Sequence, residues 1–196
     1  MNKVNFDKLM TEALEGGGKK VLLHCCCGPC ATACVERIRD KCDLTLFWYN
    51  PNIMPQAERE KRLDNLKKVA SHFGVNLIEG DEDERDFIRA AKGLEDEKEG
   101  GKRCDECFYL RLRAAAEKAK KEGYEYFCST LTVSPHKNSD KINEIGALVA
   151  EETGVKWLFS DFKKREGFKR SIELSAELGL YRQDYCGCAY GKQREN

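Results

Sequence analysis

Three short cysteine motifs hold most of the residues in this chain that could do chemistry. The first spans residues 22–30 and reads LLHCCCGPC, so that three consecutive cysteines follow a short apolar run and a fourth follows a Gly-Pro turn. Consecutive side chains at the end of a strand cannot all face one core, but a tight turn can direct several thiols to one point. Thiolates gathered in this way bind iron–sulfur clusters, zinc or copper(I).

The second motif is a pair of cysteines, Cys104 and Cys107, at the predicted start of a helix. One helical turn separates them, and the free N–H groups and the dipole of the helix N-terminus favour thiolates there. Alone, this spacing fits either a redox dithiol or half of a zinc site. With Cys25 and Cys26 it completes a set of four thiolates. Adjacent cysteines reach different irons of a cluster more easily than one zinc ion, which favours [4Fe–4S] over tetrahedral zinc.

The third motif is Cys186-Gly187-Cys188 near the end of the chain. Two cysteines one residue apart close a small, strained ring when oxidised, and such disulfides are labile. Gly187 supplies the backbone freedom that this turn needs. We therefore predict a redox-active pair, with ligation of a second metal as the alternative. Cys27 and Cys30 could assist either centre. The other cysteines are predicted to fill the core: Cys34, Cys42 and Cys128.

Two histidines and one aspartate follow predicted strands closely enough to join this chemistry. His24 precedes the cysteine turn, His136 lies in the loop after the fourth strand, and Asp161 follows the fifth strand. Each could bind a metal or deliver protons, and each could equally hold a loop by hydrogen bonds. The third histidine, His72, lies in a long charged helix and is predicted to be structural or exposed.

A basic segment with interleaved aromatic residues follows Asp161 and suits binding of loop or single-stranded RNA. The alternative interpretation is an ordinary solvated helix face. The basic residues are Lys163, Lys164, Arg165, Lys169 and Arg170, with Lys192 and Arg194 near the terminus, and the aromatic residues are Phe162 and Phe168.

Strands and helices alternate along the chain, which predicts a parallel sheet covered on both faces. The predicted strands are residues 20–24, 44–48, 75–79, 126–129 and 155–159. The predicted helices are residues 6–14, 30–40, 56–73, 85–91, 104–121 and 139–153, with a last helix that ends near residue 178. Ligands of such sheets bind beyond the carboxyl ends of the strands. The cysteine turn, residues 49–52, residues 129–136 and Asp161 all fall at that edge.

Length and composition describe a chain that can bury a core and does not cross a membrane. The 196 residues are 41% hydrophobic, which predicts one globular domain over residues 1–196. No apolar run approaches the roughly 18 residues of a membrane span, and the N-terminus lacks a signal-peptide core. We therefore expect a cytoplasmic protein, in which 11 cysteines indicate metal or redox chemistry rather than disulfides. The 34 basic and 34 acidic residues balance, so no overall field attracts a polyanion.

Five motifs in order give the chain a resemblance to the QueH-type epoxyqueuosine reductases. They are LLHCCCGPC over residues 22–30, CxxCxxLRL over 104–112, STLxxSPHK over 129–137, DFKK over 161–164 and LYRQxYCGC over 180–188. This resemblance implies a three-layer α/β/α fold of the nucleotide-hydrolase-like (HUP) type with a five-stranded, mostly parallel sheet. It also implies reduction of epoxyqueuosine to queuosine at the wobble position of tRNA, without cobalamin and with an electron donor of unknown identity.

The same resemblance implies roles for individual residues. A [4Fe–4S] cluster would be held by Cys25, Cys26, Cys104 and Cys107. A redox-active pair would be formed by Cys186 and Cys188, and a second iron would lie near the cluster.

Two other functions remain open from the sequence. A tRNA sulfur-transfer enzyme of the ATP-pyrophosphatase type would share the fold, but it uses a glycine-rich phosphate loop where this chain has its cysteine turn. A zinc-stabilised RNA-binding module would explain the Cys104–Cys107 pair, but it leaves the pair at Cys186 and Cys188 without a role.

Overall fold

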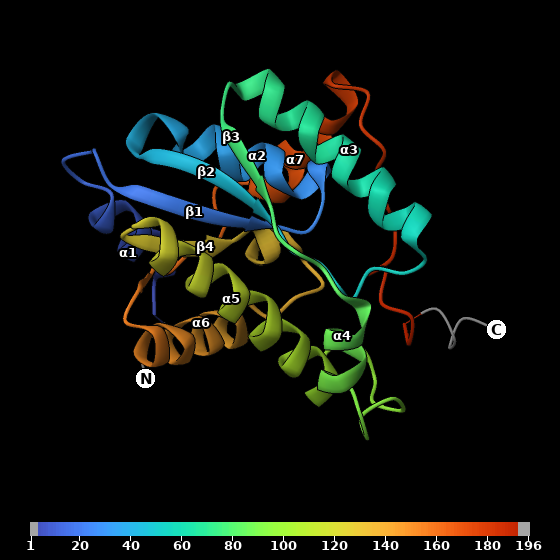
Figure 1. Ribbon diagram of the computed structural model, residues 1–196. Coiled ribbons are helices and arrows are strands. Elements are labelled where there is room, and N and C mark those ends of the chain that lie inside the picture. Colours follow the sequence, from blue (N-terminus) through green and yellow to red (C-terminus); the bar gives the residue numbers. More distant parts are fainter. Residues whose placement is uncertain (1–3, 192–196) are drawn as a thin grey trace.

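The computed structural model of this chain describes residues 4–191, which form a parallel sheet between two layers of helices (Figure 1). The strands are β1 (Lys20–Cys25), β2 (Asp43–Trp48), β3 (Asn76–Glu79), β4 (Tyr126–Ser129) and β5 (Lys156–Trp157). The helices are α1 (Phe6–Ala13), α2 (Gly28–Ile38), α3 (Gln56–Phe73), α4 (Glu84–Ala90), α5 (Lys102–Glu122), α6 (Ser139–Thr153) and α7 (Gly167–Glu177). Two short 3₁₀ helices are η1 (Arg39–Lys41) and η2 (Thr130–Val133).

The five strands are all parallel and are ordered β3-β2-β1-β4-β5. Strand β1 lies in the middle, with Leu23 opposite Leu46 of β2 and Cys128 of β4. Its run of apolar residues is fully buried because helices cover both faces of the sheet, as is typical of parallel strands. The predicted α/β fold class is therefore confirmed.

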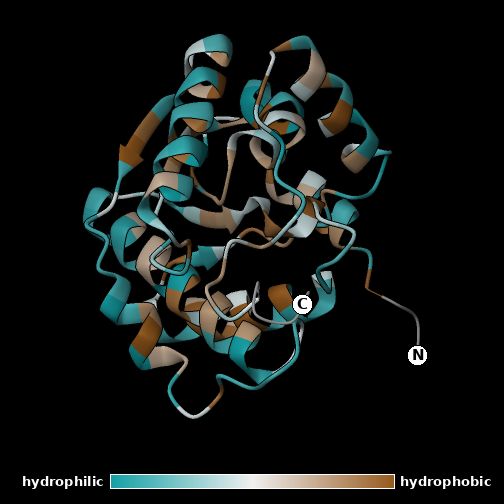
Figure 2. Cartoon of the chain, turned by 90° about the vertical axis from the view of Figure 1, so that its right-hand side faces the viewer, coloured by the Kyte–Doolittle hydropathy of each residue, from teal (hydrophilic) through white to brown (hydrophobic). Residues whose placement is uncertain are grey.

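The helices form one layer on each face of the sheet. Helix α2 packs against both α3 and α7 on one face, and α5 and α6 pack together on the other, with α4 against α5 (Figure 1). Most helices mix hydrophilic and hydrophobic residues, as Figure 2 shows, so that each can bury one side and expose the other. No helix within residues 4–191 is both long and apolar enough to span a membrane.

The fifth strand is shorter than the predicted residues 155–159, and Asn143 of α6 holds the segment that follows it. The Asn143 Oδ1 atom accepts hydrogen bonds from Trp157 Nε1 (2.9 Å) and Ser160 N (3.1 Å). Its Nδ2 donates to the Ser160 carbonyl at 2.9 Å. The Asn143 side chain thus satisfies both backbone groups of Ser160, beyond the end of the strand.

Helix α2 begins two residues earlier than predicted because Cys27 caps it. The Cys27 Sγ accepts a hydrogen bond from Cys30 N at 3.4 Å, and Pro29 stands in the first turn, where its missing N–H costs nothing. Strand β1 therefore passes into α2 with only Cys26 and Cys27 between them.

The segment after α7 returns to the carboxyl edge of the sheet, along the right-hand side of Figure 1. Ile53, just after β2, forms an antiparallel bridge with Cys188, and Met54 N donates to the Gly187 carbonyl at 2.9 Å. These contacts bring the third cysteine motif to the edge where the first motif ends.

Candidate active site

Two neighbouring cavities at the carboxyl edge bring the three cysteine motifs together. The larger, of about 610 Å³, is lined by Cys26 and Cys30 of the first motif, and the smaller, of about 120 Å³, by Cys104 and Cys107 of the second. Six residues line both cavities: Glu99, Arg111, His136, Lys137, Cys186 and Cys188. The third motif therefore lies between the first two.

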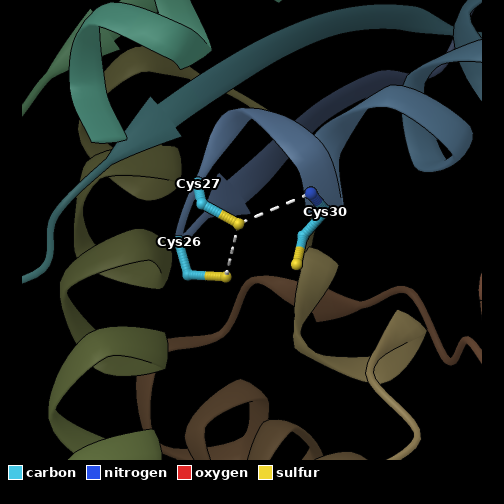
Figure 3. Close-up of side chains that lie close together, drawn as sticks. All are labelled: Cys26, Cys27 and Cys30. Carbon is cyan, nitrogen blue, oxygen red and sulfur yellow. Dashed lines mark hydrogen bonds between the residues drawn. The ribbon is translucent and has the colours of Figure 1, made fainter. Parts of the chain in front are cut away.

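Three sulfur atoms of the first motif point toward one another, as Figure 3 shows. The Sγ atoms of Cys26, Cys27 and Cys30 all lie within 4.8 Å of one another. The turn is tight because Gly28 packs on α3, where an added Cβ would lie 2.6 Å from the Asn65 carbonyl oxygen. A group of thiols this close can bind a soft metal with little rearrangement.

Cys26 is the thiol of this group that loses its proton most readily. Hydrogen bonds from the Cys27 and Cys30 thiols lower the pKa of Cys26 well below its usual value, against the effect of burial. The positive charges of Lys137 and Arg111 act in the same direction. Burial instead raises the pKa of Cys27 to about 12. Of the three thiols, Cys26 is thus the one whose surroundings most favour the thiolate.

The second motif stands in the first two turns of α5 beside the smaller cavity. Cys104 Sγ accepts a hydrogen bond from Gly100 N at 3.2 Å. Cys107 is buried in a small apolar cluster with Phe87, Ala91 and Cys188. Burial raises the pKa of Cys104, and that of Cys107 to about 12, so that binding of a metal here would release protons.

Arg62 of α3 holds the third motif in place through its backbone. Its guanidinium donates hydrogen bonds to the carbonyls of Cys186 (2.9 Å) and Tyr185 (3.2 Å), and to Glu58 at 2.7 Å. Gly187 has a positive φ of 89°, and an added Cβ would lie 2.9 Å from Arg62 Nη2. Only glycine fits here without strain. All eleven cysteines lie among the described residues, and none forms a disulfide.

Cys25 lies apart from the cavities, unlike the other predicted ligands. It is 0% exposed, belongs to the apolar core together with Cys34 and Cys128, and donates its S–H to the Leu23 carbonyl at 3.3 Å. Its role as a cluster ligand stays an untested prediction. The grouping of the three sulfurs favours Cys27 or Cys30 as the second thiol beside Cys26, and of these two only Cys30 lines a cavity.

Of the other candidates, only His136 lies at the cavities. His24 is buried, with Nδ1 2.9 Å from Ser129 Oγ and Nε2 3.1 Å from the Tyr49 carbonyl oxygen, so it joins the ends of β1, β2 and β4. Burial lowers the pKa of His24 to about 4. Asp161 lines neither cavity and lies 3.4 Å from Lys163 Nζ.

The predicted basic surface is largely neutralised by acidic neighbours. Lys163 pairs with Asp161, Arg165 with Asp7, and Lys169 with Glu166, while Arg170 pairs with Glu36, Glu173 and Glu177. Lys164 is exposed and has no ion-pair partner among residues 4–191. Lys192 and Arg194 lie outside the described residues. Phe168 lines the larger cavity, with the guanidinium of Arg182 5.2 Å from its ring centre.

Sequence reasoning missed three basic residues at the site: Arg62, Arg111 and Lys137. Arg111 follows Cys104 and Cys107 at helical spacing, so all three lie on one face of α5. That spacing could have indicated it. Nothing in the local sequence indicates that Arg62 reaches the site, because its partners in the third motif lie more than 120 positions away.

The residues at the cavities fit an iron–sulfur cluster. Thiols from three motifs converge there, and soft sulfur ligands select iron–sulfur centres, zinc or copper(I). Arg111 adds a buried donor, Nη2, that has no hydrogen-bond partner among the described residues. Such a donor suits the sulfur atoms of a negatively charged cluster.

Comparison with known proteins gives consistent matches. A sequence model of the family described as Epoxyqueuosine reductase QueH matches residues 21–194. The protein of that name from Thermotoga maritima is 42% identical over 173 residues, covering 87% of this chain and 88% of the relative. The one from Streptococcus pyogenes serotype M1 is 39% identical over 204 residues, covering 98% and 80%.

Among solved structures, this chain is similar to the U34-tRNA thiolase NcsA from Methanococcus maripaludis with its [4Fe-4S] cluster. The TM-score is 0.55 at 11% sequence identity, over 94% of this chain and 66% of the other. This likeness shows the fold alone, and it identifies the sheet and its helices as the predicted HUP-like type.

Proposed function

This chain belongs to the epoxyqueuosine reductase QueH family, which makes it a reductase of epoxyqueuosine in tRNA, and we propose that the thiols at the two cavities carry out the reduction. The observation that supports this is the convergence of three cysteine motifs on neighbouring cavities at the carboxyl edge of the sheet.

Four cysteine thiolates at these cavities would hold a [4Fe–4S] cluster. Cys26 contributes from the first motif and Cys104 and Cys107 from the second, with Cys27 or Cys30 as the fourth ligand. The closeness of the three sulfurs of the first motif supports this set. When bound, the cluster supplies single electrons, and the proposed reaction includes no cobalamin. Of the three grouped sulfurs of the first motif, this set leaves one unused, and that thiol could bind a second iron, which would polarise the epoxide oxygen.

Cys186 and Cys188, as a pair of thiols, can supply the electrons and protons that the reduction consumes. Removal of an epoxide oxygen as water leaves an alkene and consumes two electrons and two protons. Oxidation of two thiols to a disulfide releases the same number of each. Cys186 and Cys188 line both cavities, so they stand where electrons and protons are needed. His136 lines both cavities as well and can carry protons to the leaving oxygen. A reductant of unknown identity would restore the dithiol.

The larger cavity suits a single nucleoside turned out of an anticodon loop. Its volume of about 610 Å³ is in the usual range for small-molecule sites, and enzymes that act on a base take it out of the stack. Phe168, with Arg182 over its ring, offers a face on which the base can stack. Because its substrate is tRNA, we place this protein in the cytoplasm.

The proposed function is tested on protein purified without oxygen, by absorption spectroscopy and by analysis of iron and sulfide. We expect a brown protein with about four irons and four sulfides per chain, and more iron if the second centre is present. A colourless protein that holds stoichiometric zinc would overturn the proposal.

Single-turnover reduction of an epoxyqueuosine-containing anticodon stem-loop tests the cysteine pair. Cys186→Ser and Cys188→Ser should abolish the reaction, whereas Cys34→Ser, a substitution in the core, should retain it. If the first two variants complete one turnover and fail only on the second, the pair serves re-reduction instead.

A further inference from the structure

We propose that Arg111 is the buried counter-cation of the cluster and raises its reduction potential. This inference rests on the proposed function, because it requires a cluster at the cavities. It goes further in assigning a role to a residue that is not one of the cluster's ligands.

Arg111 is a fully buried guanidinium that lacks an acidic partner. It is 2% exposed, and no carboxylate within residues 4–191 forms an ion pair with it. Arg62, which is equally buried, has the Glu58 carboxylate at 2.7 Å. An arginine does not lose its proton in a protein, and an unpaired buried charge is strongly unfavourable. The negative charge that balances Arg111 must therefore come from its surroundings.

The hydrogen bonds of Arg111 leave one end of its guanidinium unused. Nε donates to the Cys107 carbonyl at 3.2 Å and Nη1 to Asn50 Oδ1 at 3.4 Å. Nη2 is buried and has no partner among the described residues. Both acceptors are neutral, so these bonds fix the position of the side chain without neutralising it.

The groups around Arg111 identify the missing anion as sulfur-based. Its positive charge interacts with the thiols of Cys107, Cys186, Cys26 and Cys104, in order of decreasing strength. Lys137, the other cation that lines both cavities, has the same sign and cannot balance it. The acidic residues that line either cavity, Glu99, Asp105 and Asp184, make no ion pair with Arg111. Thiolates, or a cluster bound by them, are the remaining counter-charge.

The positive charge of Arg111 should change the reduction potential of the cluster. A thiolate-bound cluster is negatively charged, and one-electron reduction adds a further negative charge. A fixed cation nearby stabilises the reduced form more than the oxidised form, and N–H donors to the sulfurs do the same. Arg111 therefore makes the cluster easier to reduce, which suits a centre that must accept electrons from an outside donor.

Redox titration of the iron-loaded protein with reporter dyes tests this, followed by absorption and by electron paramagnetic resonance. Arg111→Gln removes the charge and keeps a polar side chain, and Arg111→Lys keeps the charge. Arg113→Gln is the control, since Arg113 lies on the same helix and pairs with Glu117 at the surface. Iron content and melting temperature are measured on every variant.

We expect Arg111→Gln to keep its iron and to shift the potential negatively, with at least a tenfold change in the dye equilibrium, or 59 mV for one electron. Arg111→Lys should shift less than tenfold, and Arg113→Gln not at all. An unchanged potential in iron-loaded Arg111→Gln would overturn the proposal. Loss of iron or of the fold in both Arg111 variants would also overturn it, because Arg111 would then be a structural residue. A wild-type protein without a cluster would instead overturn the proposed function.

Discussion

Substitution of Gly187 by alanine should release the third cysteine motif from the edge of the sheet. The residue has φ +89°, and a side chain in this left-handed region costs roughly 1–2 kcal/mol. An added Cβ would also lie 2.9–3.0 Å from three atoms of the Arg62 guanidinium. The guanidinium must move, and loss of one of its hydrogen bonds costs about 1.5–3 kcal/mol.

The total cost of about 3 kcal/mol falls on the contact between the third cysteine motif and the edge of the sheet, so this segment should detach more often while the rest of the protein stays folded. Each 1.4 kcal/mol is a factor of ten, which predicts on the order of a 100-fold faster alkylation of Cys188 in Gly187→Ala. Cys188 is a sensitive reporter because it is 8% exposed in the docked segment. Its modification by iodoacetamide is measured under reducing, oxygen-free conditions, with peptide mass spectrometry to separate it from the other cysteines.

Gly16→Ala provides a matched control for the backbone term. Gly16 has a similar φ of +82°, and nothing lies within 4 Å of an added Cβ. Gly16→Ala should therefore have only the cost of the backbone strain, and its rate of Cys188 alkylation should equal that of the wild type. In an Arg62→Ala background the collision is absent, so Gly187→Ala should then add only the strain term. If the rate of Cys188 alkylation in Gly187→Ala stays within about twofold of the wild-type rate, the hydrogen bonds from Arg62 do not hold this segment in place.

Three further predictions concern the histidine, the cysteine turn and the basic surface. Because burial lowers the pKa of His24 to about 4, the unfolded chain binds a proton below pH 6.5 that the folded chain does not bind. The free energy of unfolding should therefore fall by roughly 3 kcal/mol between pH 6.5 and 4. Urea denaturation should show less of this loss in His24→Gln, and an identical pH dependence would refute the assignment. Cys26→Ser should lose most of the iron and Cys25→Ser should retain it, which iron analysis decides; the opposite result would make Cys25 the ligand. Lys164→Glu should weaken tRNA binding and reduce the slope of its salt dependence by about one unit, and equal binding by this variant and the wild type would make this surface an ordinary solvated one. Lys163→Glu should instead lower the melting temperature, because Lys163 contacts Asp161 and two backbone carbonyls.

The sequence by itself determined the architecture and the edge at which the site lies. Alternating apolar strands and amphipathic helices are local patterns, and their order implies a parallel sheet with its ligands at the carboxyl ends. The strand and helix positions were therefore predictable to within a few residues. Strand β5 (Lys156–Trp157) likewise lies inside its predicted range of 155–159.

Only the tertiary structure decided which neighbours of the cysteine turn face the cavities. Cys25 and Cys26 are adjacent and chemically identical, so local sequence cannot rank them. Their packing separates them, because Cys25 ends β1 inside the core and Cys26 follows where the chain leaves the sheet. His24 was ambiguous for the same reason, since its two ring nitrogens contact Ser129, at the end of β4, and Tyr49, just after β2.

The charges at the site also depend on contacts between distant parts of the chain. Arg170 looks available to RNA in the sequence, but Glu36, 134 positions away, pairs with it. Arg62 reaches the Cys186 carbonyl over 124 positions. Arg111 lies in a recognisable motif, but its lack of an acidic partner is visible only when every neighbour is in place. Residue type and spacing specify the chemistry that is possible. Burial and long-range pairing decide which residues are free to perform it, because both depend on the packing of the whole fold.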